Sequence, residues 1–139
     1  MNITMLTEDM FSTGKPFAQG EVLIWLKKYA PQSVLDGLAN LKDFVEMPLE
    51  HGKIILGHSE TGHCHVLKPV SKDVPMSMAA QALINKANDN FLALKVHHEC
   101  ALIHERDVDA HQAVILPPGD YIRTIREEQT VRGWQRVQD

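Results

Sequence analysis

The chain has 139 residues, of which 44% are apolar and 23% are charged, proportions that are ordinary for a soluble globular protein. Its length suits one domain that buries a core without disulfides or metal. The formal net charge of −4 excludes the basic field by which proteins attract nucleic acid, so we expect no nucleic-acid partner.

The sequence also argues against a membrane or secreted protein. No run approaches the ~20 consecutive apolar residues that a transmembrane helix needs. The first twenty residues lack a basic start followed by an apolar stretch, so we expect no secretion signal and synthesis in the cytoplasm. In that setting Cys64 and Cys100 are expected to be reduced thiols.

Residues 1–19 are expected to form an N-terminal arm, followed by a single β-rich domain at residues 20–139. The arm shows neither a helical nor a strand period. Its apolar side chains include Met5, Leu6, Met10, Phe11 and Phe17. Ordering the backbone of the arm costs ~1–2 kcal/mol of conformational entropy per residue. An isolated arm cannot bury enough surface to offset this cost. We therefore expect these side chains to lie on another protein subunit.

Eight short runs of apolar and β-prone residues predict strands. They span residues 20–28, 53–57, 63–67, 91–96, 99–103, 111–116, 121–127 and 134–138. The fourth and fifth of these strands are expected to be continuous or interrupted by a bulge at His97 and His98. Turn residues recur every ~8–12 positions in the second half, as in sandwiches and small barrels.

Two further segments have helical patterns. The first opens at Pro31, with Ser33 as its cap and Asp36 three residues on. Its apolar stripe is Val34, Leu35, Leu38 and Leu41. The second, residues 77–86, has the Ala, Leu and Met content of a helix.

These elements predict a mainly β fold: a small barrel or sandwich of about eight short strands with one or two short helices. The alternative is an α+β sheet with one helix packed on it. Between two of the strands, Pro117, Pro118 and Gly119 have the chemistry of a type II turn, which requires a positive φ at Gly119.

Histidine carries the strongest chemical signal, beginning with the run GHSETGHCH at residues 57–65. Imidazole is the commonest transition-metal ligand, and side chains at i and i+2 of a strand share a face, so His63 and His65 can bind one ion. Glu60 or His58 can add a third ligand from the preceding turn. The competing interpretation is a polar turn whose histidines bond to neighbouring carbonyl groups.

A second run adds His104 and His111, which can present two ligands from the two ends of a loop. We therefore predict a site for a divalent transition metal, Zn²⁺ or similar. Its ligands are Glu60, His63, His65, His104 and His111. A metalloprotease helix is excluded, because Val108 stands four residues after His104. His98 and Cys100 share a strand face and can also bind zinc, but a small buried residue is the preferred interpretation of Cys100.

The sequence assigns no catalytic residue. Cys64 lies beside His63 and His65, but adjacent strand residues face opposite sides, so a base for this thiol has to come from elsewhere. The chain has no Walker A loop and no GxGxxG or GxSxG motif.

One segment resembles the cupin family, whose first motif supplies two metal-binding histidines inside a small β-barrel. The resemblance rests on Gly57, His63, His65, Pro117 and Gly119. The cupin glutamate would fall at Pro69 or Val70 and the second-motif histidine at Ile122, so those two ligands are missing.

A broader resemblance, over residues 20–139, is to small uncharacterised proteins of bacteriophages and bacteria. It rests on GHSETGHCH at 57–65, His104 and Glu105 with His111, LPPGDY at 116–121 and the closing strand at 134–139. This resemblance implies a phage or prophage setting, in the host cytoplasm and then in the virion for a structural protein. It implies no reaction.

These observations favour a virion structural or accessory protein, of the capsid decoration or cement type, that forms a homo-oligomer or binds a capsid protein. A cupin-like metal-dependent enzyme and a metal-binding phage accessory factor are the alternatives, and both depend on the histidine cluster. An enzyme of that kind needs a pocket with an open metal position, whereas an extended arm serves contacts with a capsid lattice.

Overall fold

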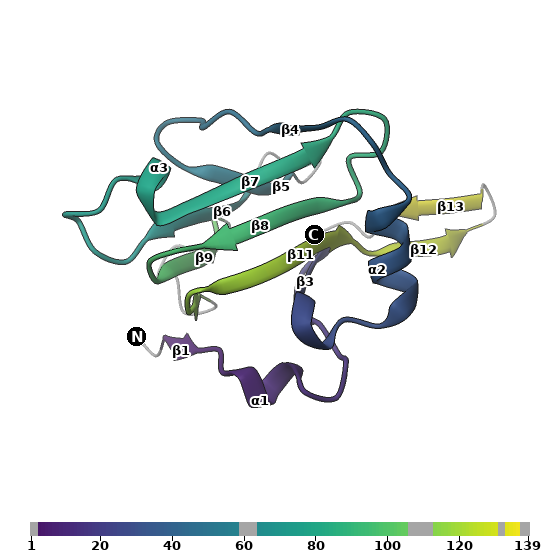
Figure 1. Ribbon diagram of the computed structural model, residues 1–139, viewed down its shortest axis with the longest axis horizontal. Helices are drawn as coiled ribbons and strands as arrows, with labels where there is room; N and C mark the ends of the chain where they lie inside the picture. Colours follow the sequence, from purple (N-terminus) through teal and green to yellow (C-terminus); the bar gives the residue numbers. More distant parts are fainter. Residues whose placement is uncertain (1–2, 59–63, 106–112, 131–132, 137–139) are drawn as a thin grey trace.

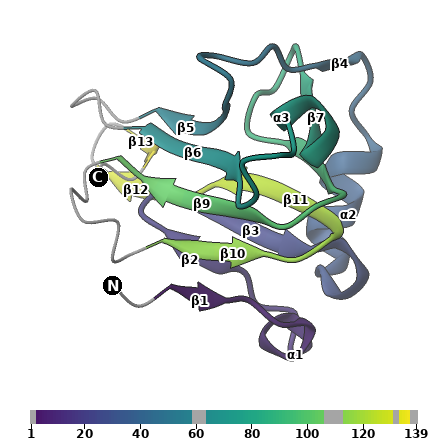
Figure 2. The ribbon, with the colours of Figure 1, turned by 90° about the vertical axis from the view of Figure 1, so that its left-hand side faces the viewer.

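The chain folds into two β-sheets that pack face to face as a sandwich. The computed structural model describes residues 3–58, 64–105, 113–130 and 133–136. Figure 1 faces the sandwich and Figure 2 shows its two layers from the side. The described strands form two main sheets and no closed barrel, so the mainly β sandwich is confirmed and the α+β alternative is wrong.

The first sheet has five described strands in the order β1-β10-β9-β6-β5. They are β1 (Thr4–Met5), β10 (Val114–Leu116), β9 (Cys100–His104), β6 (Cys64–Pro69) and β5 (Ile54–His58). Neighbouring strands are antiparallel, except that β1 is parallel to β10. This order places β1 and β5 at the two edges of the sheet.

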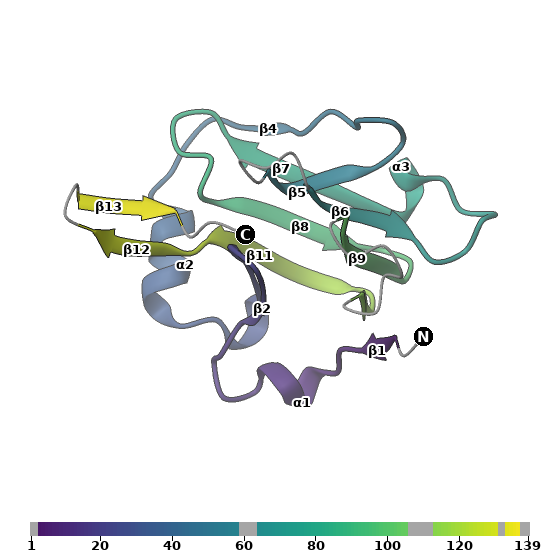
Figure 3. The ribbon, with the colours of Figure 1, turned by 180° about the vertical axis from the view of Figure 1, so that it is seen from behind.

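The second sheet has six described strands in the order β2-β3-β11-β8-β7-β4, all antiparallel to their neighbours. They are β2 (Phe17–Gln19), β3 (Val22–Leu26), β11 (Gly119–Ile125), β8 (Leu92–Val96), β7 (Ala80–Asn85) and β4 (Phe44–Glu46). A separate hairpin of β12 (Glu127–Thr130) and β13 (Gly133–Arg136) projects beyond the sandwich, as Figures 1 and 3 show.

Alternation of apolar and polar residues explains why these segments are strands. In β8, Leu92, Leu94 and Val96 are buried, whereas Lys95 is exposed. Successive strand side chains face opposite sides, so this pattern turns one side of β8 toward the other sheet. Burying an apolar side chain of this size contributes about 1.5–3 kcal/mol, and the shared core holds the two sheets together.

The helices are short. They are α1 (Glu8–Phe11), the 3-10 helix η1 (Lys27–Tyr29), α2 (Gln32–Ala39) and α3 (Met76–Ala79). The helix predicted after Pro31 is confirmed as α2, but Pro31 rather than Ser33 occupies the N-cap, and no side chain caps the helix. None of the described helices has the length and apolar character to cross a membrane.

The helix predicted at residues 77–86 is wrong. Only the single turn of α3 forms, and from Ala80 the chain continues as strand β7. β7 pairs with β4 on one side and with β8 on the other, and its Ala80 and Ala82 are buried in the core. Helix propensity is a weak preference, so strand pairing on both sides and burial outweigh it.

The N-terminal segment shares its core with the rest of the chain. Leu6 and Phe11 belong to the main hydrophobic cluster, and Phe17 packs against it. The rings of Phe11 and Tyr121 meet edge to face, with centroids 6.1 Å apart. The expectation that the arm's side chains lie on another subunit is therefore wrong for Leu6 and Phe11. Pairing of β1 with β10 and of β2 with β3 orders the segment.

The chain changes sheets at His97 and His98. β8 belongs to the six-stranded sheet and β9 to the five-stranded sheet. The backbone N–H groups of both histidines donate to the Ala79 carbonyl, at 2.7 and 3.1 Å. The two strands predicted here are therefore neither continuous nor separated by a bulge in one sheet.

The turn before β11 also differs from the prediction. Gly119 does not have a positive φ; it is already extended and lies opposite Val96. The Tyr121 hydroxyl donates to the Pro117 carbonyl at 2.7 Å. The chain thus enters β11 directly, and the type II turn with a left-handed Gly119 is wrong.

Gly119→Ala is expected to change the free energy of unfolding by no more than about 0.5 kcal/mol, because an added Cβ would lie at an ordinary contact distance of 3.4 Å from Tyr121. Gly52→Ala provides the contrast. Its φ is +73° and nothing lies within 4 Å, so its cost of about 1–2 kcal/mol comes from backbone strain. Urea unfolding measures both, and equal losses at the two positions would contradict the extended Gly119.

Candidate functional site

His65 and His104 meet on the inner face of the five-stranded sheet. They are register partners in β6 and β9, and both are buried. Their rings stack, with centroids 4.1 Å apart and planes at 11°. The structure thus brings together two of the five predicted metal ligands, one from each histidine run.

Gln19 and Glu21 extend this pair into a buried polar cluster. His65 Nδ1 donates to Gln19 Oε1 at 2.8 Å, and Gln19 Nε2 donates to the Leu102 carbonyl at 3.5 Å. Glu21 Oε1 and His65 Cδ2 each lie 3.2 Å from the point that a Cβ on Gly57 would occupy, so the carboxylate is close to the imidazole. Because Gln19 belongs to β2, its bond to His65 joins the two sheets.

The stacked rings do not aim at one ion. An imidazole nitrogen binds metal in the plane of its ring, and two nearly parallel planes do not converge. One ring has to rotate before His65 and His104 can share a metal. The described residues contain no group of three or more His, Cys, Asp or Glu side chains placed to hold one. Glu60, His63 and His111 lie outside the described residues, so the five-ligand site stays a prediction.

His98 and Cys100 do not form a further ligand pair. Cys100 is buried in the core, as preferred from the sequence, whereas His98 is exposed. The Cys100 thiol donates to the backbone carbonyl of His98 at 3.2 Å. Burial raises the pKa of Cys100 to about 12, so this thiol is chemically inert in the folded protein.

A thiol–imidazole pair on the outer face of the same sheet was missed from the sequence. A bulge between Ile55 and Gly57 shifts the register of β5, so that Gly57 pairs with His65 and His58 pairs with Cys64. Cys64 Sγ lies 3.7 Å from His58 Nδ1. The available signal was the closeness in sequence of the predicted strands at 53–57 and 63–67, since their pairing sets residues near the facing ends opposite each other.

Cys64 is nevertheless a poor nucleophile. Burial raises the pKa of its thiol, and the negative charges of Glu105 and Glu50 raise it further. The thiol therefore stays protonated at neutral pH. The Glu105 backbone N–H donates to the Cys64 carbonyl at 2.9 Å, and its carboxylate lies 3.7 Å from Lys53 Nζ. His58 stands where a base would be needed, but the carboxylates oppose formation of the thiolate.

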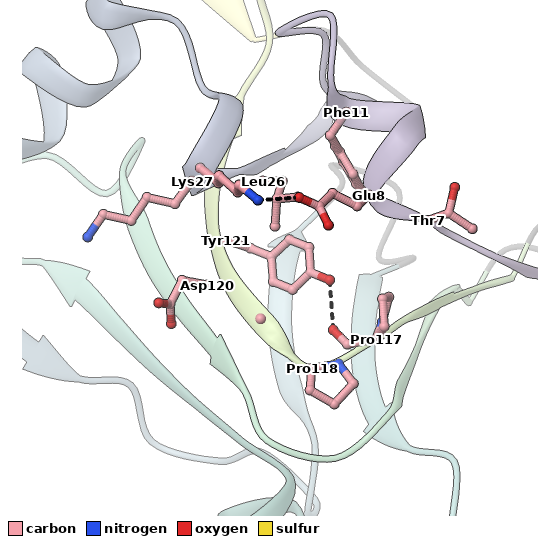
Figure 4. A pocket seen from close by; sticks show the side chains of 11 residues that line it. Thr7, Glu8, Phe11, Leu26, Lys27, Pro117, Pro118, Asp120 and Tyr121 are labelled. Atoms are coloured by element: carbon pink, nitrogen blue, oxygen red, sulfur yellow. Dashed lines mark hydrogen bonds and ion pairs between the residues drawn. The ribbon is translucent and has the colours of Figure 1, made fainter.

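A groove of about 490 Å³ lies between the N-terminal segment and the start of β11 (Figure 4). Its apolar lining is Phe11, Leu26, Pro117, Pro118 and Tyr121. Glu8 also lines it, at 2.6 Å from Lys28 Nζ, and accepts a hydrogen bond from the Tyr29 hydroxyl at 2.9 Å. The hydrogen bond from Lys28 holds the pKa of Glu8 below its ordinary value. The groove therefore offers an apolar surface beside a paired charge, which suits binding.

His65→Ala is expected to lower the free energy of unfolding by about 2–4 kcal/mol, because it opens a cavity and removes the partner of Gln19 Oε1 in the core. The control is His97→Ala, which removes an exposed imidazole and should cost less than about 0.5 kcal/mol. Chemical denaturation followed by circular dichroism measures both. Equal stability of the two variants would contradict the buried cluster.

The two thiols are expected to differ in alkylation. At pH 8 iodoacetamide should modify Cys64 slowly and leave Cys100 untouched, because a raised pKa lowers the thiolate fraction and Cys100 is also buried. Mass spectrometry should find one adduct in the folded protein and two after denaturation. Rapid modification of Cys100 in the folded chain would contradict its position in the core.

Comparison with known proteins assigns the chain to a family but to no reaction. A family model described as "Domain of unknown function (DUF8820)" matches residues 18–126. No curated protein and no solved structure matches the chain. The match agrees with the expected uncharacterised family and leaves the cupin resemblance and the phage setting as expectations. Since it covers well over half of the sequence, the chain belongs to the DUF8820 family.

Proposed function

We propose that this chain is a structural or accessory protein of a phage virion, of the capsid decoration or cement type. It binds protein through the outer side of its N-terminal segment. The observation that carries the proposal is a short segment that has three exposed apolar side chains and an open strand edge. The phage setting itself rests on the sequence resemblance described above.

The N-terminal segment is apolar on two sides. Ile3, Met5 and Met10 are 48%, 40% and 51% exposed, whereas Leu6 and Phe11 from the same segment are buried. The buried side chains fasten the segment to the core, and the exposed ones remain on its surface. Three exposed apolar side chains on one short segment are a candidate for a protein contact.

The same segment has an open edge. β1 is bonded to β10 and has no neighbour on its other side among the described strands; Figure 2 shows it at the margin of the sheet. The backbone groups of an edge strand can pair with a strand from another chain. The partner that fits is an extended segment of a capsid subunit, with apolar side chains over Met5 and Met10.

His58, His65 and His104 lie at one end of the five-stranded sheet, which we call the histidine-rich end. This end also supports a binding role rather than an enzymatic one. His65 is held inside the core by Gln19 and by the stacked ring of His104. The carboxylates around Cys64 disfavour its reactive form. These groups therefore support a role in the stability of the fold rather than a role in a reaction.

A metal-dependent role, as a cupin-like enzyme or a metal-binding accessory factor, is the second proposal. Its support is the hydrogen bond from His65 Nδ1 to Gln19, since a bond of this kind commonly orients a metal-ligating histidine. Zn²⁺ or a similar divalent ion would take its other ligands from Glu60, His63, His104 and His111. Stoichiometric metal with an exchangeable water in the purified chain would favour this role.

Met5→Lys and Met10→Lys are expected to release the chain from phage heads. Phage particles are purified from cells that produce the wild type or a variant, and the chain is quantified by mass spectrometry. A lysine placed against an apolar partner leaves a desolvated charge, so the particle-bound fraction should fall about tenfold or more. The melting temperature should hold, because both methionines are exposed.

The matched control is Met78→Lys, which alters a methionine that is 60% exposed on α3, away from β1. This variant should bind particles like the wild type. Light scattering of the purified chain tests whether the partner is instead a second copy of this chain. Association that increases with concentration and is lost in Met5→Lys would identify a second copy as the partner. A wild-type chain absent from particles and monomeric at all concentrations would overturn the proposal.

A further inference from the structure

The outer face of the five-stranded sheet carries a row of three polar side chains at its histidine-rich end. His58 in β5 lies opposite Cys64 in β6, and Glu105, just after β9, bonds to Cys64 through the backbone. Three adjacent strands thus place an imidazole, a thiol and a carboxylate at one level of the sheet. The row takes no part in the binding surface on the N-terminal segment.

We infer that Cys64 and His58 bind one Zn²⁺ ion through Sγ and Nδ1. These atoms lie 3.7 Å apart. A Zn–S bond of ~2.3 Å and a Zn–N bond of ~2.0–2.1 Å that meet at the tetrahedral angle separate sulfur and nitrogen by about 3.6 Å. The pair therefore has the spacing that zinc requires, without movement of the backbone.

The strands hold this spacing in place. Cys64 and His58 are directly paired in the ladder of β5 and β6, so their backbones are fixed relative to each other. His58 is exposed and Cys64 is partly exposed, which leaves the ion a path from solvent. A sulfur–nitrogen pair selects zinc over Mg²⁺ and Ca²⁺, which prefer oxygen ligands.

The surrounding charges favour a cation. The Glu105 backbone N–H donates to the Cys64 carbonyl at 2.9 Å, which places a carboxylate residue beside the pair, and a carboxylate there attracts a divalent ion. Lys53, 3.7 Å from the Glu105 carboxylate, is the opposing positive charge. The affinity for zinc should therefore respond to substitutions that leave both ligands intact.

Binding of Zn²⁺ releases one proton. The Cys64 thiol releases its proton to solvent and binds as thiolate, while neutral His58 contributes the lone pair of Nδ1. In this proposal the described residues supply two ligands, and water fills the remaining positions of the tetrahedron.

The test is a titration of the full, reduced chain with Co²⁺, a spectroscopic substitute for zinc. One Co²⁺ per chain should produce the near-ultraviolet absorption of a thiolate–cobalt bond, and Zn²⁺ should remove it. Cys64→Ser should abolish the band, and His58→Gln should weaken binding about tenfold or more. The control His97→Gln, which changes an exposed histidine elsewhere, should bind like the wild type.

Two charge variants separate a metal site from a structural contact. Lys53→Gln should tighten binding and Glu105→Gln should weaken it, each by about 2- to 5-fold, as expected for one surface charge. Circular dichroism confirms that each variant is folded. Wild-type affinity in Cys64→Ser, or in His58→Gln, would overturn the inference and place the metal on other ligands.

Discussion

The register of β5, β6 and β9 is the constraint on which the histidine-rich end depends. With His65 opposite His104 on the inner face, the neighbouring Cys64 must face outward beside Glu105. A shift of the strand register by one residue would turn each strand over. The imidazoles of His65 and His104 would then face solvent, and the Cys64 thiol and the Glu105 carboxylate would enter the core. The bulge in β5 acts in the same way on His58, which it places beside Cys64.

Close contact between the sheets holds this register. A Cβ on Gly57 would lie 2.6 Å from Val22 Cγ2, so only glycine fits where β5 faces β3. The hydrogen bond from His65 to Gln19 joins the sheets at the same end. Because both faces of β6 share one backbone, the contacts that keep His65 inside also keep Cys64 outside. Stability of the inner cluster and geometry of the outer pair are therefore linked.

The two proposed surfaces belong to different parts of the chain. His58, Cys64 and Glu105 lie within the family match at residues 18–126, whereas the exposed side chains of the N-terminal segment precede it. They also lie apart in space, because β5 and β1 are the opposite edges of the five-stranded sheet. A metal ion at one edge and a protein partner at the other can thus be bound independently.

The sequence by itself determined the β-rich class and most of the strands, because alternation of apolar residues is a local pattern. It also determined that Cys64 and His65 face opposite sides of β6. Only the tertiary structure decided that residues 80–85 form a strand, that Phe11 closes the core, and that His58 stands beside Cys64. Those outcomes depend on strand register and on burial between segments far apart along the chain. The local propensity of a segment does not predict either of them.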